Sequence, residues 1–218
     1  MKPLSTDTVL LVVANPVDLL TSLAQSLSGL PASQVLGTGT FLDTVRLRGL
    51  LADKAKVCIH NHRTITHAWL TRQQVTADSI DLCVLGVHGD SQVVAWSATT
   101  INGVPYNESF LRNTFNYTGL ENEFRRRTQR AMQIKGATPF GIGSIISRIC
   151  SSILFNERKI FPVTNFQPEF GCCFSTPVVL GREGITEKIT MTLNSEEEAD
   201  LAASAKRLRD TIERINDQ

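Results

Sequence analysis

The near-continuous apolar run TVLLVVANPVD, residues 8–18, limits the possible folds more than any other part of the sequence. A strand that is apolar on both faces is typical of the centre of a parallel sheet. Four leucines at helical spacing follow in residues 19–27, and Gly29 ends that pattern. The run therefore predicts a buried strand that leads directly into a helix.

The order of the remaining patterns indicates an α/β fold. Residues 33–55 predict a short strand, a glycine-broken turn and a second helix, and strand–helix–strand–helix order implies a right-handed crossover. Residues 79–103 predict two strands around a turn that contains Gly86 and Gly89. Helical patterns at 107–136 and 140–155 precede an antiparallel meander predicted for residues 159–193.

The last predicted helix, residues 194–215, carries two specific signals. Ser195 and Glu198 have the spacing of a capping box. An apolar stripe at helical spacing should dock this helix on a core: Leu201, Ala205, Leu208, Ile212 and Ile215.

Composition narrows the class of partner. Of the 218 residues, 42% are hydrophobic and 20% are charged, which describes a chain with a sizeable core. A net charge of +1 argues against a nucleic-acid or membrane surface as partner, and the basic run 125–130 fits a solvated helix face. No segment approaches the length of a membrane span. Five cysteines without Cys-x-x-Cys spacing fit a reducing, cytoplasmic location.

Three short blocks contain the side chains that could carry chemistry. NPVD contains Asn15, LDTVRLR contains Asp43 and Arg46, and LGVHGDS contains His88. Each block alone has a structural explanation, because Asn-Pro is a turn, Asp-x-x-Arg is a surface pair on a helix and His-Gly-Asp is a tight loop.

Taken together and in order, these blocks resemble the lactate/malate dehydrogenase family, in particular its NAD-dependent L-lactate dehydrogenases. NPVD, LDTVRLR, LGVHGDS with the WS that follows it, KGAT, PV and VVLGREGI occur in the family's order, from about Val9 to Ile215. The resemblance implies an oxidoreductase that interconverts L-lactate and pyruvate with NAD as cofactor. It also implies a small 2-hydroxy or 2-oxo acid as substrate and assembly into dimers or tetramers.

The resemblance implies a role for each substrate-side residue. His88 would be the general acid and base, since imidazole titrates near neutral pH. Asp43 would orient that imidazole, and Arg46 would grip the substrate carboxylate with its planar fork. Asn15 would hydrogen-bond substrate and cofactor on a cis-proline bend, and Thr138 of KGAT would line the substrate pocket.

On the cofactor side, the resemblance implies contacts from Val13, Asn15 and Ile142, with Ile142 against the nicotinamide ring. A dinucleotide-binding fold also needs a glycine-rich turn after its first strand, and no Gly-x-Gly-x-x-Gly follows a strand here. We therefore expect residues 1–40 to be the tail end of a doubly wound Rossmann domain, containing its last strands only. Residues 41–218 would form the α+β catalytic, substrate-binding C-terminal domain.

This reading implies that the chain is incomplete and inactive as written. Strand 9–14 would lose a neighbour and present an apolar edge. The mobile loop that sets specificity would also be missing, so malate or a bulkier 2-hydroxy acid stays open as substrate. A non-catalytic protein, such as a truncated paralogue or a pseudogene product, stays open as a second class.

Residues 57–74 are a surplus against the family's spacing. Joining Lys56 to Val75 restores that spacing, and the codons for Val57-Cys58 and Gln74 can contain the bases that begin and end an intron. We interpret the stretch as a translated intron, with a genuine surface loop as the alternative. It contains His60, His62 and His67, but no carboxylate or structured second shell of a metal site is evident, so we expect no metal.

Overall fold

The computed structural model describes residues 4–60, 76–109, 117–135 and 139–216. They form two compact units. The first unit combines Met1–Leu42, Cys83–Ala95 and Phe140–Gln218, and the second combines Asp43–Leu82 and Trp96–Pro139. None of the helices in the described ranges has both the length and the apolar character that crossing a membrane requires.

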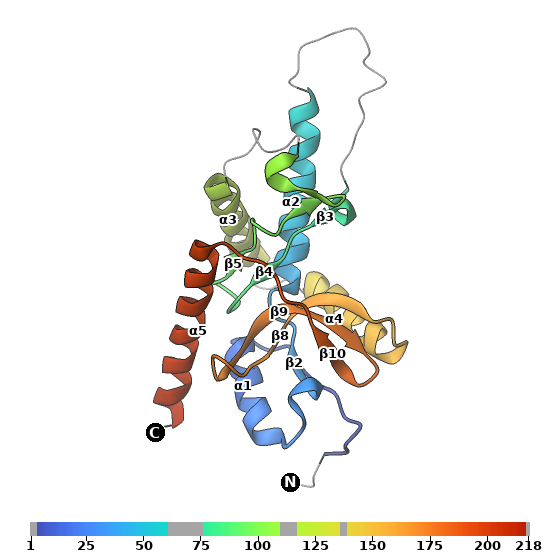
Figure 1. Ribbon diagram of the computed structural model, residues 1–218, viewed down its shortest axis with the longest axis vertical. Coiled ribbons are helices and arrows are strands. Elements are labelled where there is room, and N and C mark those ends of the chain that lie inside the picture. Colours follow the sequence, from blue (N-terminus) through green and yellow to red (C-terminus); the bar gives the residue numbers. More distant parts are fainter. Residues whose placement is uncertain (1–3, 61–75, 110–116, 136–138, 217–218) are drawn as a thin grey trace. The chain divides into compact units, whose positions relative to one another are not determined.

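The first unit is built on a five-stranded mixed sheet with the order β1-β2-β8-β9-β10 (Figure 1). β1 (Leu10–Val12) and β2 (Val35–Gly37) are parallel, as the crossover predicted. β8 (Lys159–Gln167), β9 (Cys172–Gly181) and β10 (Gly184–Lys188) form the predicted antiparallel meander. β2 joins the two parts by pairing with β8 at Gly37 and Thr164.

β1 differs from the central strand that its apolar run predicts. Its three residues are half-buried, and among the described strands it pairs only with β2, so it lies at the sheet edge. Val13, directly after it, is 36% exposed. The apolar edge expected for this strand is therefore present, whereas full burial on both faces is not.

Three helices cover the sheet of the first unit. α1 (Val17–Ser28) contacts β2, β8 and β9, and it ends at Gly29, whose φ of 69° closes the helix in the left-handed region. α4 (Pro139–Leu154) places Arg148 over the paired rings of Phe41 and Phe161, 5.1 Å from the Phe41 centroid. α5 (Ser195–Asn216) lies against α1 and β9.

The stripe on α5 docks largely as predicted. Ala205 and Leu208 are buried against Cys172 and Phe174 of β9, and Leu201 and Ile212 pack at the margin of the same cluster. Ile215 is 41% exposed, so the stripe ends one turn earlier than its spacing predicts.

In its described residues, the second unit contains two α-helices, two short 3-10 helices (Ala77–Ser79 and Tyr106–Glu108) and one small sheet. α2 (Phe41–His60) begins at the end of the first unit, and α3 (Tyr117–Lys135) carries the basic run, whose arginines 125–127 and 130 are exposed as predicted. β3 (Ile80–Asp81), β6 (Thr100–Ile101) and β7 (Val104–Pro105) form the sheet. α2 extends past Lys56 to His60, while residues 61–74 of the surplus stretch, with His62 and His67, lie outside the described residues.

The capping box of α5 begins one residue earlier than predicted. The Asn194 side-chain oxygen accepts hydrogen bonds from the amides of Glu196 and Glu197, at 3.0 and 2.9 Å. The Glu197 carboxylate accepts the Asn194 amide in return, at 3.2 Å. The prediction of Ser195 and Glu198 is wrong, because Asn194 and Glu197 have the same spacing one residue earlier and form the cap hydrogen bonds.

Asn194→Ala should therefore lower the free energy of unfolding by about 1 kcal/mol, since two helix amides lose their acceptor. Ser195→Ala is the matched control and should have a much smaller effect. Urea unfolding followed by circular dichroism measures both, and equal losses in the two variants would contradict the assigned cap.

Candidate active site

His88 lies in the loop between two short paired strands of the first unit, β4 (Val84–Leu85) and β5 (Val93–Val94). The loop needs glycine at both sides of the Val87-His88 pair, because Gly86 has φ of 82° and Gly89 has φ of 112°. A side chain at position 86 would also meet Ser204 Oγ at 3.2 Å. The glycines predicted to mark this turn thus allow a tight loop that presents His88.

Two consecutive amides of this loop are held by different elements. Gly86 exchanges a pair of backbone hydrogen bonds with Ser175 of β9, at 2.9 and 3.0 Å. The Val87 amide donates to Ser204 Oγ of α5 at 3.2 Å. The loop is therefore attached to both the sheet and the C-terminal helix.

The third amide, that of His88, donates to the carboxylate of Asp18 at 2.7 Å. Asp18 lies in the first turn of α1 and is only 3% exposed. Its other oxygen accepts the Thr164 hydroxyl of β8 at 2.6 Å. One buried carboxylate thus connects the histidine loop with α1 and β8.

Burial raises the pKa of Asp18 from its ordinary value of 3.8 to about 6. The hydrogen bonds from Thr164 and His88, and the charge of His88, oppose that rise by favouring the ionised form. At neutral pH the Asp18 carboxylate is consequently ionised. The hydrogen bonds from Thr164 and His88 offset only part of the free-energy cost of burying that charge.

Asn15 and His88 line the same pocket. It has a volume of about 460 Å³ and is formed by residues 15–19 together with Val87, His88 and Leu208. Asn15 is exposed and precedes the cis peptide bond to Pro16. The first unit thus places an amide and an imidazole beside one cavity whose remaining walls are mainly apolar.

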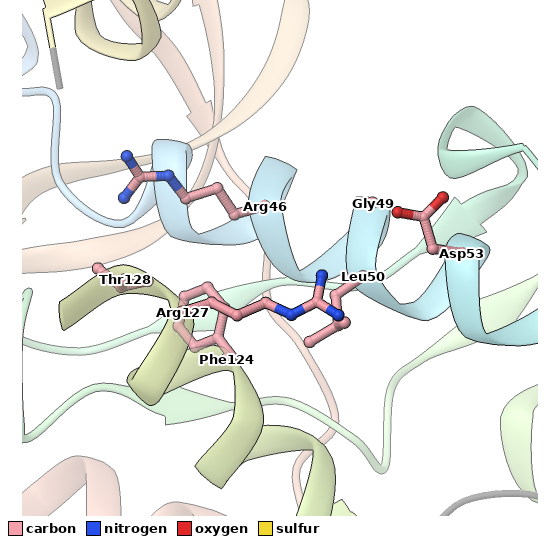
Figure 2. Close-up of a pocket in the computed structure, with 7 residues that line it drawn as sticks. All are labelled: Arg46, Gly49, Leu50, Asp53, Phe124, Arg127 and Thr128. Atoms are coloured by element: carbon pink, nitrogen blue, oxygen red, sulfur yellow. The ribbon is translucent and has the colours of Figure 1, made fainter. Parts of the chain in front are cut away.

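Arg46 lines a pocket of about 320 Å³ in the second unit, between α2 and α3 (Figure 2). Its half-buried guanidinium forms no hydrogen bond or ion pair with the residues that the structure describes. The remaining lining residues are Gly49, Leu50, Asp53, Phe124, Arg127 and Thr128.

The second arginine of this pocket is already neutralised. Arg127 pairs with Glu123 at 2.7 Å, and Lys54 contacts the other oxygen of Glu123 at 2.7 Å. The hydrogen bond from Lys54 lowers the pKa of Glu123, so this network stays charged. Arg127 and Arg46 extend in opposite directions in Figure 2, and of the two only Arg127 has a charged partner among the described residues.

The other predicted site residues are placed as follows. Asp43 is buried near the start of α2, in the second unit, and Ile142 is half-buried on α4. Val13 is partly exposed after β1. Thr138 lies outside the described residues.

Sequence reasoning missed Asp18, although NPVD was among the blocks that stood out. An acidic residue in the first turn of a helix normally signals a favourable dipole interaction at an exposed end. The available signal was its position between an apolar run and an apolar helix, where a charged residue is unusual.

Comparison with known proteins supports the family resemblance that the short sequence blocks indicated. Residues 40–218 match the family described as lactate/malate dehydrogenase, alpha/beta C-terminal domain. L-lactate dehydrogenase A of Rhizopus oryzae is 36% identical over 209 residues, which cover 96% of this chain and 60% of that protein. L-lactate dehydrogenase of Chloroherpeton thalassium is 34% identical over 219 residues, 98% of this chain and 66% of the relative.

The chain therefore belongs to the lactate/malate dehydrogenase family, and its mixed α/β fold is consistent with that family's C-terminal domain. It spans less than two thirds of the length of these relatives, whose names describe them as L-lactate dehydrogenases.

The raised pKa of Asp18 predicts a pH-dependent stability. Between pH 4 and 6 the folded chain holds a proton on Asp18 that the unfolded chain releases, so stability should fall as pH rises through about 6. The difference between 3.8 and about 6 corresponds to about 3 kcal/mol. Asp18→Asn should remove this fall.

Urea unfolding at several pH values between 4 and 7 tests this prediction. The Asp18→Asn profile should diverge from the wild-type profile as pH rises, whereas exposed Asp200 of α5 supplies a control, Asp200→Asn, with a profile parallel to wild type. Parallel profiles for all three proteins would contradict a buried, pKa-raised Asp18.

Proposed function

We propose that this chain supplies the substrate-side groups of an NAD-dependent oxidoreductase that interconverts L-lactate and pyruvate. The observation that carries the proposal is the pocket of the first unit, where Asn15 and His88 lie on one cavity of about 460 Å³. A small 2-oxo acid fits a cavity of that size, and these two side chains can both reach an oxygen of the ligand.

His88 would exchange a proton with the C2 oxygen of the substrate. During pyruvate reduction the imidazolium donates that proton, and during lactate oxidation the neutral imidazole accepts it. Asn15 would donate a hydrogen bond to the same oxygen and so favour its negative charge. In this proposal Asp43 hydrogen-bonds the His88 imidazole and fixes its tautomer.

Arg46 would bind the substrate carboxylate. Support comes from the absence of a partner for this half-buried guanidinium in the described chain, while neighbouring Arg127 is paired with Glu123. A bidentate contact would supply orientation as well as charge. Thr138, which follows α3 in the sequence, would complete the substrate contacts.

The residues around β1 fit a nicotinamide cofactor. Val13 offers an exposed apolar surface at the end of β1, Asn15 offers an amide beside it, and Ile142 offers a second half-buried apolar surface. When bound, NAD would supply or accept the hydride at C2 of the substrate. The chain's own residues would hold the ring and exchange the proton.

We also propose a cytoplasmic location, because the cysteines that the structure describes, Cys83, Cys150, Cys172 and Cys173, are all free thiols. Burial raises the pKa of Cys172 to about 11 and that of Cys173 to about 12, so both remain protonated and unreactive.

The test of this function uses a chimera. The part of the Rhizopus oryzae enzyme that this chain does not span is joined to residues 1–218, and NADH oxidation is followed with pyruvate or oxaloacetate as substrate. The chimera should prefer pyruvate.

His88→Ala should lower kcat of the chimera about a hundredfold or more, since the proton donor is lost. Arg46→Gln should raise KM for pyruvate, and exposed Arg130→Gln is the matched control.

A preference for oxaloacetate would identify malate and oxaloacetate as the substrate pair instead. A chimera that folds and binds NADH but reduces neither acid would favour a non-catalytic chain. Full activity in His88→Ala would overturn the assigned proton donor.

A further inference from the structure

The strongest unexplained feature of the first unit is the buried carboxylate behind the histidine loop. Asp18 is 3% exposed, and the proposed chemistry gives it no direct contact with substrate or cofactor. A buried acid is costly to ionise, so the presence of a carboxylate at this position calls for a specific role.

We propose that Asp18 is a positioning residue for His88: its carboxylate fixes the backbone of His88 so that the side chain lines the pocket beside Asn15. The proposal rests on the function proposed above, because it concerns how the proton-exchanging group is held. It differs from the role of Asp43, which concerns the imidazole ring.

The geometry supports this role in two ways. The Asp18–His88 hydrogen bond of 2.7 Å is the shortest of the three that anchor successive amides of the loop, the others being 2.9 Å at Gly86 and 3.2 Å at Val87. This hydrogen bond is formed by the amide of His88 itself, whereas the other two are formed by the amides of the two preceding residues. Without it, the amides of Gly86 and Val87 would keep their acceptors, whereas the amide of His88 would lose this one.

The carboxylate is itself held in orientation. Thr164 donates to its other oxygen at 2.6 Å, and Thr164 is fully buried in β8. Since both oxygens are engaged from opposite elements, the side chain cannot rotate without breaking a charge-assisted hydrogen bond. Position is thereby transmitted from the rigid meander to His88.

An amide can imitate this arrangement. In Asp18→Asn the side-chain oxygen can still accept the His88 amide, while the amide nitrogen donates to Thr164 Oγ1. Thr164 can then direct its own hydrogen to Ser175 Oγ, which lies 3.4 Å away. Asn is therefore expected to preserve the position of His88, and Ala is expected to lose it.

Amide hydrogen exchange on the 218-residue chain at neutral pH tests the proposal. Asp18→Ala should lower the protection of the His88 amide about tenfold or more relative to the Gly86 amide, whose acceptor is unchanged. Asp18→Asn should restore that protection. Thr164→Val leaves the acceptor in place but removes the contact that orients it, so it should lower the protection of the His88 amide by a smaller factor than Asp18→Ala does.

Unchanged protection of His88 in Asp18→Ala would overturn the proposal. An equal loss at His88, Gly86 and the amides of β8 and β9 would also overturn it, because it would show a general structural role. Pyruvate reduction by the chimera with the Rhizopus oryzae enzyme reports on the proposed function separately. If the chimera reduces neither acid but His88 loses protection selectively in Asp18→Ala, the function fails while the positioning by Asp18 stands.

Discussion

The hydrogen bond from the His88 amide to the buried Asp18 carboxylate is the interaction on which the proposed site depends. It connects a loop of two tight glycine turns to the first turn of α1, and the same carboxylate reaches β8 through Thr164. Burial makes the negative charge of Asp18 costly, and the hydrogen bonds from the His88 amide and the Thr164 hydroxyl partly offset that cost. The loop is thereby attached to α1, β9 and α5, and the proposed proton transfer depends on such a fixed geometry.

The charged residues of the two units differ in whether the described part of the chain supplies them with a partner. Asp18 has two buried donors, and Arg127 and Lys54 share Glu123. Arg46, half-buried beside a cavity, has no such partner among the described residues. The lack of a partner for Arg46 among the described residues supports the proposed binding of a carboxylate.

Local patterns predicted the elements well where one face is clearly apolar. The meander of β8–β10, the parallel β1–β2 pair and most of the α5 stripe follow directly from residue spacing. Asn15 and His88 were also identified from short blocks, and they line one pocket. The strands and helices depend on neighbours in sequence or on a simple period, which is why the sequence alone suffices for them, whereas Asn15 and His88 were identified through the resemblance to a family.

Features that depend on distant elements were not predictable in the same way. The burial of Asp18 requires β8 and the His88 loop, which lie 70 or more residues away along the chain. The cap of α5 required a choice between Asn194 and Ser195 that only the approach of the preceding segment decides. The half-buried edge position of β1 likewise depends on which strands surround it.

The most direct test of this account is a through-hydrogen-bond correlation, measured by magnetic resonance, between the His88 amide nitrogen and the Asp18 carboxyl carbon. The account predicts that the correlation is present at neutral pH, where Asp18 is ionised, and that the His88 amide proton is shifted strongly downfield. A missing correlation, together with a His88 amide that exchanges freely with water, would contradict the claim that Asp18 holds the histidine loop.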